Sequence, residues 1–155
     1  MNVVRKTEEE LFLVDRAVPL RILGGFFVLF ASLFLAFADR IPFPAALFPW
    51  IFLLVGAAIA ILPRNTFIRF DRDRGEVTID RIGTVLPRQQ RTIPLDQIHM
   101  VEVQEQRGSK GGSTYRVRLL IVDGDPVNFT EYSSSGRGSK DELAETVRTW
   151  LGRFA

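Results

Sequence analysis

The stretch Ile22–Leu62, ILGGFFVLFASLFLAFADRIPFPAALFPWIFLLVGAAIAIL, decides the fold of this chain of 155 residues. Two apolar runs, at about 22–38 and 44–62, flank a short polar break at Asp39-Arg40. A membrane-spanning helix needs roughly 20 mostly apolar residues, and both runs are close to that length. Because the link between them is short, two such helices have to run antiparallel. The stretch therefore predicts a transmembrane α-helical hairpin over residues 22–62.

Small residues recur in both apolar runs. In lipid, small side chains let helix backbones approach closely, which favours helix–helix association. We therefore expect the two helices to pack through these positions, and to leave some of them for further membrane partners. The predicted packing residues are Gly24, Gly25, Gly56, Ala57 and Ala60.

Basic residues on the two flanks predict the orientation of the hairpin. The flanking arginines and lysine are Arg5, Lys6, Arg16 and Arg21 before it, and Arg64, Arg69, Arg72 and Arg74 after it. The turn carries Arg40 alone. Because Lys and Arg favour the cytoplasmic side, both termini are expected there. The sequence thus predicts an integral protein of an inner, plasma or thylakoid membrane, in contact with membrane lipids.

Residues 64–155 carry the signature of a separate cytoplasmic domain. Apolar residues alternate with polar ones between turn signals, which predicts about six half-buried antiparallel strands. An apolar stripe of Leu143, Val147 and Trp150 then recurs at helical spacing and predicts a C-terminal helix that buries these residues in the core. Ser139 and Glu142 have the spacing of a capping box at its start. We expect an α+β or all-β fold closed by one helix.

The N-terminal segment, 1–21, is polar and is expected on the cytoplasmic side. Its one apolar piece, Glu10–Asp15, fits two structures. It is either a short strand that pairs with the C-terminal domain or a segment at the membrane interface.

Three segments of the C-terminal domain carry a resemblance to a known family. They are FDRDRGEVTI (70–79), IPLDQIHMVEV (93–103) and YRVRL (115–119), and Trp150 follows in the last helix. This order resembles a bacterial PH-like domain on a two-helix membrane hairpin, and it is distantly similar to the photosystem I assembly proteins of cyanobacteria and plastids. The resemblance implies a PH-like bent antiparallel β-barrel capped by a C-terminal helix, and a role in assembling a photosynthetic membrane complex.

Composition and motifs argue against several classes of function. The net charge of +2 is too weak to indicate nucleic-acid binding, and the absence of Cys with a single His argues against a metal site. His99 shares strand parity with Val101 and Val103, which predicts partial burial. No nucleophile–base motif accompanies it. We therefore predict no enzyme activity, no cofactor and no small-molecule substrate.

Two basic clusters are candidate contacts with a membrane surface or an anion. Arg64, Arg69, Arg72 and Arg74 follow the hairpin, and basic residues near an anionic surface add attraction. Arg137 and Lys140 lie in a Gly/Ser loop before a helix start, where backbone N–H groups bind anions. The alternatives are neutralisation of the arginines by neighbouring acids and an ordinary helix start.

These observations predict a non-catalytic membrane protein that presents its cytoplasmic domain to another membrane protein or complex. Such a protein acts as an accessory factor, an assembly factor or a small subunit. The alternative is a membrane module that binds anionic lipid head groups.

Overall fold

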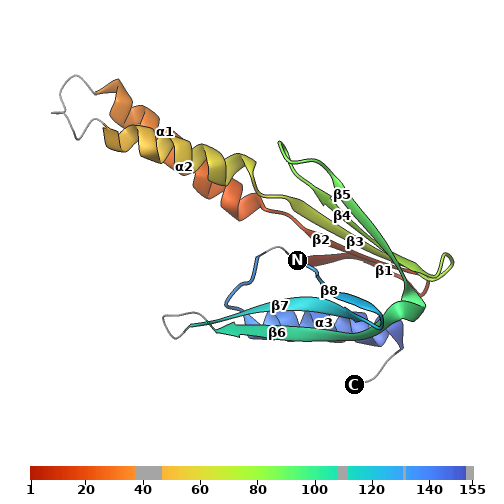
Figure 1. The fold of residues 1–155 in the computed structure, drawn as a ribbon. Helices are drawn as coiled ribbons and strands as arrows, with labels where there is room; N and C mark the ends of the chain where they lie inside the picture. The colour runs from red at the N-terminus through yellow and green to blue at the C-terminus, as the bar shows by residue number, and fades with distance from the viewer. Residues whose placement is uncertain (38–46, 108–111, 131, 153–155) are drawn as a thin grey trace. The chain divides into compact units, whose positions relative to one another are not determined.

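A computed structural model describes residues 1–37, 47–107, 112–130 and 132–152 (Figure 1). Within these ranges the chain forms three α-helices and two antiparallel sheets, so the α+β class is confirmed. The chain divides into two compact units. The first comprises Met1–Asp15, Thr66–Asp80 and Gln90–Ala155, and the second comprises Arg16–Asn65 and Arg81–Gln89.

The larger sheet joins strands from both sides of the apolar stretch. Its strands, in spatial order, are β1 (Asn2–Lys6), β2 (Glu10–Asp15), β3 (Asn65–Asp71), β4 (Glu76–Ile82) and β5 (Gln89–Pro94). β2 pairs antiparallel with β3 from Glu10↔Asp71 to Asp15↔Thr66. Of the two structures that the sequence left open for Glu10–Asp15, the strand is the one observed. The N-terminal segment 1–21 thus contributes two strands, β1 and β2, to the larger sheet. Leu11 and Leu13 of β2 are buried in the hydrophobic core, which favours this pairing.

The second sheet has the order β6 (Ile98–Arg107), β7 (Ser113–Ile121) and β8 (Gly124–Asn128), and a short 3-10 turn, η3 (Leu95–Gln97), precedes it. Helix α3 (Arg137–Leu151) follows the sheet (Figure 1). One hydrophobic core joins both sheets and α3. Its aromatic centre is Phe70, whose ring lies 6.2 Å from that of Phe129 and 5.8 Å from that of Trp150. Leu143, Val147 and Trp150 are all buried there, as the helical stripe predicted.

Two local predictions are wrong. His99 is exposed rather than partly buried, because the register of β6 shifts between Ile98 and Met100 and breaks the expected parity. Helix α3 begins two residues before Ser139, with Gly136 as its N-cap, so no capping box forms. The Ser139 hydroxyl instead donates to the Gly136 carbonyl oxygen at 3.0 Å.

The apolar stretch forms α1 (Val18–Ala36) and α2 (Phe48–Ile61). Their bounds differ from the predicted 22–38 and 44–62, and the break at Asp39-Arg40 lies outside the described residues. At 1.5 Å per residue, α1 is about 28 Å long and α2 about 21 Å. Only α1 is long and apolar enough, among the described residues, to cross a bilayer by itself.

Candidate functional site

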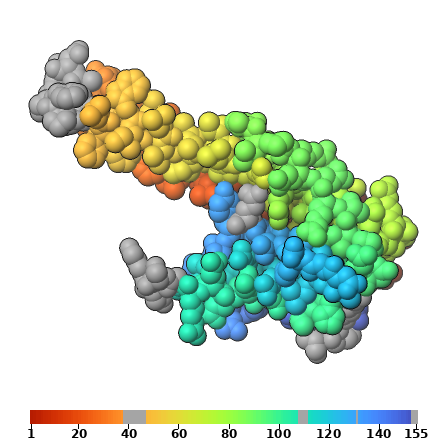
Figure 2. All heavy atoms as spheres, viewed as in Figure 1, coloured from red at the N-terminus to blue at the C-terminus, as the bar shows by residue number. Residues whose placement is uncertain are grey.

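The surface of α1 and α2 is the most unusual feature of the chain, because it is apolar almost throughout. Figure 2 shows the two helices as neighbouring bands of atoms, orange for α1 and yellow for α2. A soluble protein rarely exposes a continuous apolar surface of this extent. Its exposed large side chains include Ile22, Leu23, Phe26, Leu29, Phe30, Leu33, Phe34, Phe48, Trp50, Ile51, Leu54, Val55 and Ile61.

Between the helices, the backbones meet at glycine. A Cβ on Gly24 would lie 2.5 Å from the Ala60 nitrogen and 2.7 Å from the Gly56 oxygen. A Cβ on Gly56 would lie 2.8 Å from Cβ of Phe27. These contacts bring three of the predicted packing residues together and show that the helices run antiparallel. Ala57 is half-buried, whereas Gly25 has nothing within 4 Å of its Cβ position.

Ring contacts continue this interface along the helices. The rings of Phe27 and Phe30 lie 5.8 and 6.3 Å from that of Phe52. Ser32, the one hydroxyl in α1, donates to the Val28 carbonyl oxygen at 2.8 Å, so its polar group is satisfied within the helix. In the described part of the helix pair, the polar contacts are thus this one within α1 and those at the base of the pair.

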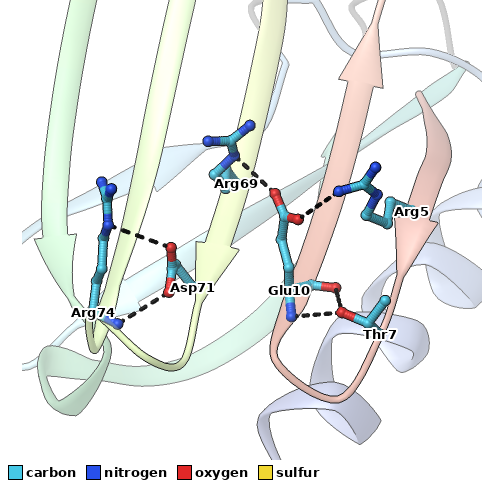
Figure 3. Close-up of polar contacts among 6 residues, drawn as sticks. All are labelled: Arg5, Thr7, Glu10, Arg69, Asp71 and Arg74. Carbon is cyan, nitrogen blue, oxygen red and sulfur yellow. Dashed lines mark hydrogen bonds and ion pairs between the residues drawn. The ribbon is translucent and has the colours of Figure 1, made fainter.

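The predicted basic cluster after the hairpin does not form one site, because its members pair locally. Arg69 Nε lies 2.9 Å from a Glu10 carboxylate oxygen, and Arg5 reaches the other oxygen at 3.2 Å (Figure 3). Arg74 Nε lies 3.7 Å from Asp71, whose other oxygen accepts the Arg74 backbone N–H at 3.0 Å. Local neutralisation, the alternative that the sequence offered, is what these contacts show for Arg69 and Arg74.

Arg72 has a structural position that the sequence did not reveal. Its guanidinium lies 4.7 Å from the centre of the Trp150 ring, and it donates to the Trp150 carbonyl oxygen. The indole N–H of Trp150 donates to the Thr7 carbonyl oxygen at 2.7 Å. Arg72 also donates its backbone N–H to Glu9 at 2.9 Å. Contacts of Arg72 and Trp150 therefore link the end of α3 to the β1–β2 turn.

The predicted anion loop is likewise engaged within the chain. Arg137 is the first residue of α3, where its Nε lies 3.4 Å from Asp141, and its guanidinium lies 5.8 Å from the Tyr115 ring centre. Lys140 is half-buried in the first turns of the same helix. The helix start thus already carries an acidic partner for its nearest arginine.

A different basic cluster lies at the base of the helix pair. Arg64 follows α2, and its Nη1 donates to the side-chain oxygen of Gln89 at 2.8 Å. Arg21 in α1 donates to the Pro63 carbonyl oxygen at 3.3 Å. Arg81, near the end of β4, and Arg88, in the β4–β5 loop, belong to the same unit. Sequence reasoning selected Arg64 but missed these two arginines, although the acid-free segment 81–91 was a usable signal.

Within the described ranges, no group of three His, Asp or Glu side chains is placed to hold a metal ion. A comparison of the sequence with protein-family models and with curated proteins found no match. The function therefore has to be inferred from the geometry of the helix pair and the domain.

Proposed function

We propose that α1 and α2 insert together into a lipid bilayer and hold the α+β domain at the cytoplasmic face, where it binds another membrane protein without catalysing a reaction. The observation that carries this proposal is the pairing of β2 with β3 on either side of the apolar helices. The exposed apolar surface of the helices supplies the affinity for lipid.

Strand pairing constrains how the chain crosses a membrane. Asp15 and Thr66 are register partners, and Asn65 accepts the Ala17 backbone N–H at 3.1 Å. The chain thus enters α1 and leaves α2 at neighbouring points. If α1 crosses the bilayer, the chain has to return before Asn65, and residues 41–62 are apolar enough to do so. Both flanks then lie on one side, and the flanking basic residues support the cytoplasmic side for them.

The domain is proposed to be PH-like, on the basis of the order of its elements. Three consecutive antiparallel strands, β6 to β8, lead into a C-terminal helix whose Trp150 is buried. The added β1–β2 hairpin distinguishes it from a domain made of residues 64–155 alone. Edge strands offer backbone groups to a partner strand, which suits a protein-binding module. A partner in photosynthetic complex assembly remains a prediction from the resemblance alone.

Two measurements test the proposal. Alkaline carbonate should leave the full chain in the membrane pellet, and tags at residue 1 and residue 155 should both be accessible only from the cytoplasmic side. Extraction by carbonate, or tags on opposite faces, would refute membrane insertion as a pair. Gentle detergent extraction should yield a complex much heavier than 17.6 kDa, and mass spectrometry should identify the partner. A lone monomer in several mild detergents would refute the partner.

A further inference from the structure

The base of the helix pair gathers positive charge from two distant parts of the sequence. The described residues of this unit, within 16–65 and 81–89, contain five arginines and no Asp, Glu or Lys. We name this set the arginine collar: Arg16, Arg21, Arg64, Arg81 and Arg88. The rest of the chain mixes both signs, as the ladder of Arg5, Glu10 and Arg69 does. Within the described residues of this unit, every charged side chain is therefore an arginine.

Direct contacts place the β4–β5 loop beside the end of α2. The Arg64 side chain lies so close to Gly83 that a Cβ there would be 3.2 Å from Arg64 Cγ. Gln89, at the other end of the loop, accepts a hydrogen bond from the same arginine at 2.8 Å. Figure 2 shows the light-green loop atoms against the end of α2. Arg64 thus ties the loop to the level at which the apolar helices end.

The loop and the end of β4 also present apolar side chains. Val85 in the loop is 64% exposed, and Ile82, the last residue of β4, is 40% exposed. Apolar residues among basic ones are typical of segments that lie at a membrane interface, where the apolar groups enter the head-group boundary and the cations meet lipid phosphates.

The interior of the collar has unused hydrogen-bonding capacity. Arg21 Nη2 donates to Pro63, but its Nε is buried without an acceptor in the described part of the chain. A buried N–H of a charged group is costly when nothing accepts its hydrogen bond. The exposed guanidinium groups of the collar, such as those of Arg16 and Arg88, are the ones that a lipid phosphate can reach, and guanidinium groups bind phosphate through paired N–H donors.

We infer that the arginine collar binds the phosphate of anionic phospholipids, with Ile82 at the end of β4 and Val85 in the β4–β5 loop resting in the head-group region. The inference rests on the proposed insertion of α1 and α2, and it names the lipid class that this base recognises. The proposed lipid contact does not include Arg69, Arg72 and Arg74. These three arginines pair with Glu10, Trp150 and Asp71, respectively.

The test uses the full chain in nanodiscs that contain phosphatidylcholine with a minor fraction of phosphatidylglycerol. Native mass spectrometry then counts the lipids that stay bound. We compare Arg16→Gln/Arg88→Gln with the matched control Arg107→Gln/Arg137→Gln, which removes the same charge from exposed positions outside the collar. Retained phosphatidylglycerol should fall about tenfold in the first variant and stay unchanged in the second. An equal effect in both variants would overturn the inference.

Two further arms identify the ligand and separate the two proposals. Millimolar inorganic phosphate should not displace the lipid, because the apolar loop residues bind only a lipid; full displacement would show a free-phosphate site instead. Val85→Ser should lower retention while leaving the charge intact. Carbonate extraction of the same variants shows whether insertion itself persists. A chain that stays in the membrane without any preference for phosphatidylglycerol refutes the collar alone.

Discussion

The two compact units differ in the burial of their large apolar side chains. Phe70 and Phe129 in the domain are fully buried, whereas Phe26 and Phe48 in the helix pair are 61% and 65% exposed. In the domain, side chains of its own strands and of α3 pack together and cover the core. The two helices bury the contact between them, and most of the large apolar side chains on their described surface are exposed. An apolar segment in the sequence therefore predicts that its side chains avoid water, but the topology decides whether other parts of the same chain can cover them.

The largest predicted effect comes from separating the two units. A chain in which a short Gly-Ser linker joins Asp15 to Thr66 should fold as a water-soluble domain, because these residues are already register partners. Residues 64–155 alone should fail to fold, because they lack β1, β2 and the buried Leu11 and Leu13. Dispersion of amide NMR signals and cooperative urea unfolding distinguish the outcomes. A cooperative transition in 64–155 would show that the N-terminal hairpin is dispensable.

Within the domain, Trp150→Ala should have the next largest effect. The substitution empties the space beside Phe70 and removes the hydrogen bond to Thr7. Truncating a buried Trp or Phe to Ala costs about 3–5 kcal/mol. Urea unfolding of the linker-joined domain measures this loss in the free energy of unfolding. Tyr132→Ala is the control, since this aromatic residue is exposed and should change stability by less than about 0.5 kcal/mol.

The sequence predicted those features that depend on local pattern. The apolar runs gave the two helices, the alternation after Thr66 gave strands, and the helical stripe placed Trp150 in the core. Each of these signals lies within a short window, where the spacing of apolar residues reports which face is buried. The ends of the elements were less accurate, as at α2 and α3, because the signals for helix termini are weaker.

The features that the sequence did not predict depend on partners distant along the chain. The strand partner of β2 is β3, which lies beyond the whole apolar stretch in the sequence. The sequence of Glu10–Asp15 was therefore equally compatible with an interfacial segment. Arg72 looked like one cation in a mixed turn, but its partner is Trp150. Arg81 in β4 and Arg88 in the β4–β5 loop belong to the same compact unit as Arg64, although they follow it by at least 17 residues. The register shift at His99 also has no local signal in the apolar pattern.

The seam of the helix pair gives a third, smaller effect. Gly24→Ala should destabilise the pair by about 1–3 kcal/mol, as overpacking typically does, because its Cβ would meet backbone atoms of Gly56 and Ala60 that have little freedom to move. Gly25→Ala is a matched control, since the new methyl group meets nothing within 4 Å. Thermal unfolding of the full chain in detergent should separate the two variants. Equal melting temperatures would contradict the close approach at Gly24.

The smallest effect is expected on the outer face of the larger sheet, where Glu10 links Arg5 and Arg69 (Figure 3). Glu10→Gln should cost the linker-joined domain about 0.5–1 kcal/mol, because exposed ion pairs are worth little individually. The carboxylate is only 23% exposed and holds two arginines, so its loss should still be measurable. The backbone N–H of Glu10 keeps its hydrogen bond to the Thr7 hydroxyl, so the turn itself is unaffected.

Salt provides the check on this ion-pair ladder. Raising the ionic strength to about 1 M shortens the screening length to about 3 Å, so the stability difference between wild type and Glu10→Gln should shrink. Asp141→Asn serves as a control that removes a single, more exposed contact, to Arg137, and should cost at most a few tenths of a kcal/mol. A Glu10→Gln effect that persists in high salt would mean that Glu10 acts through packing. In that case, packing rather than charge would account for the contribution of this sheet face to the stability of the domain.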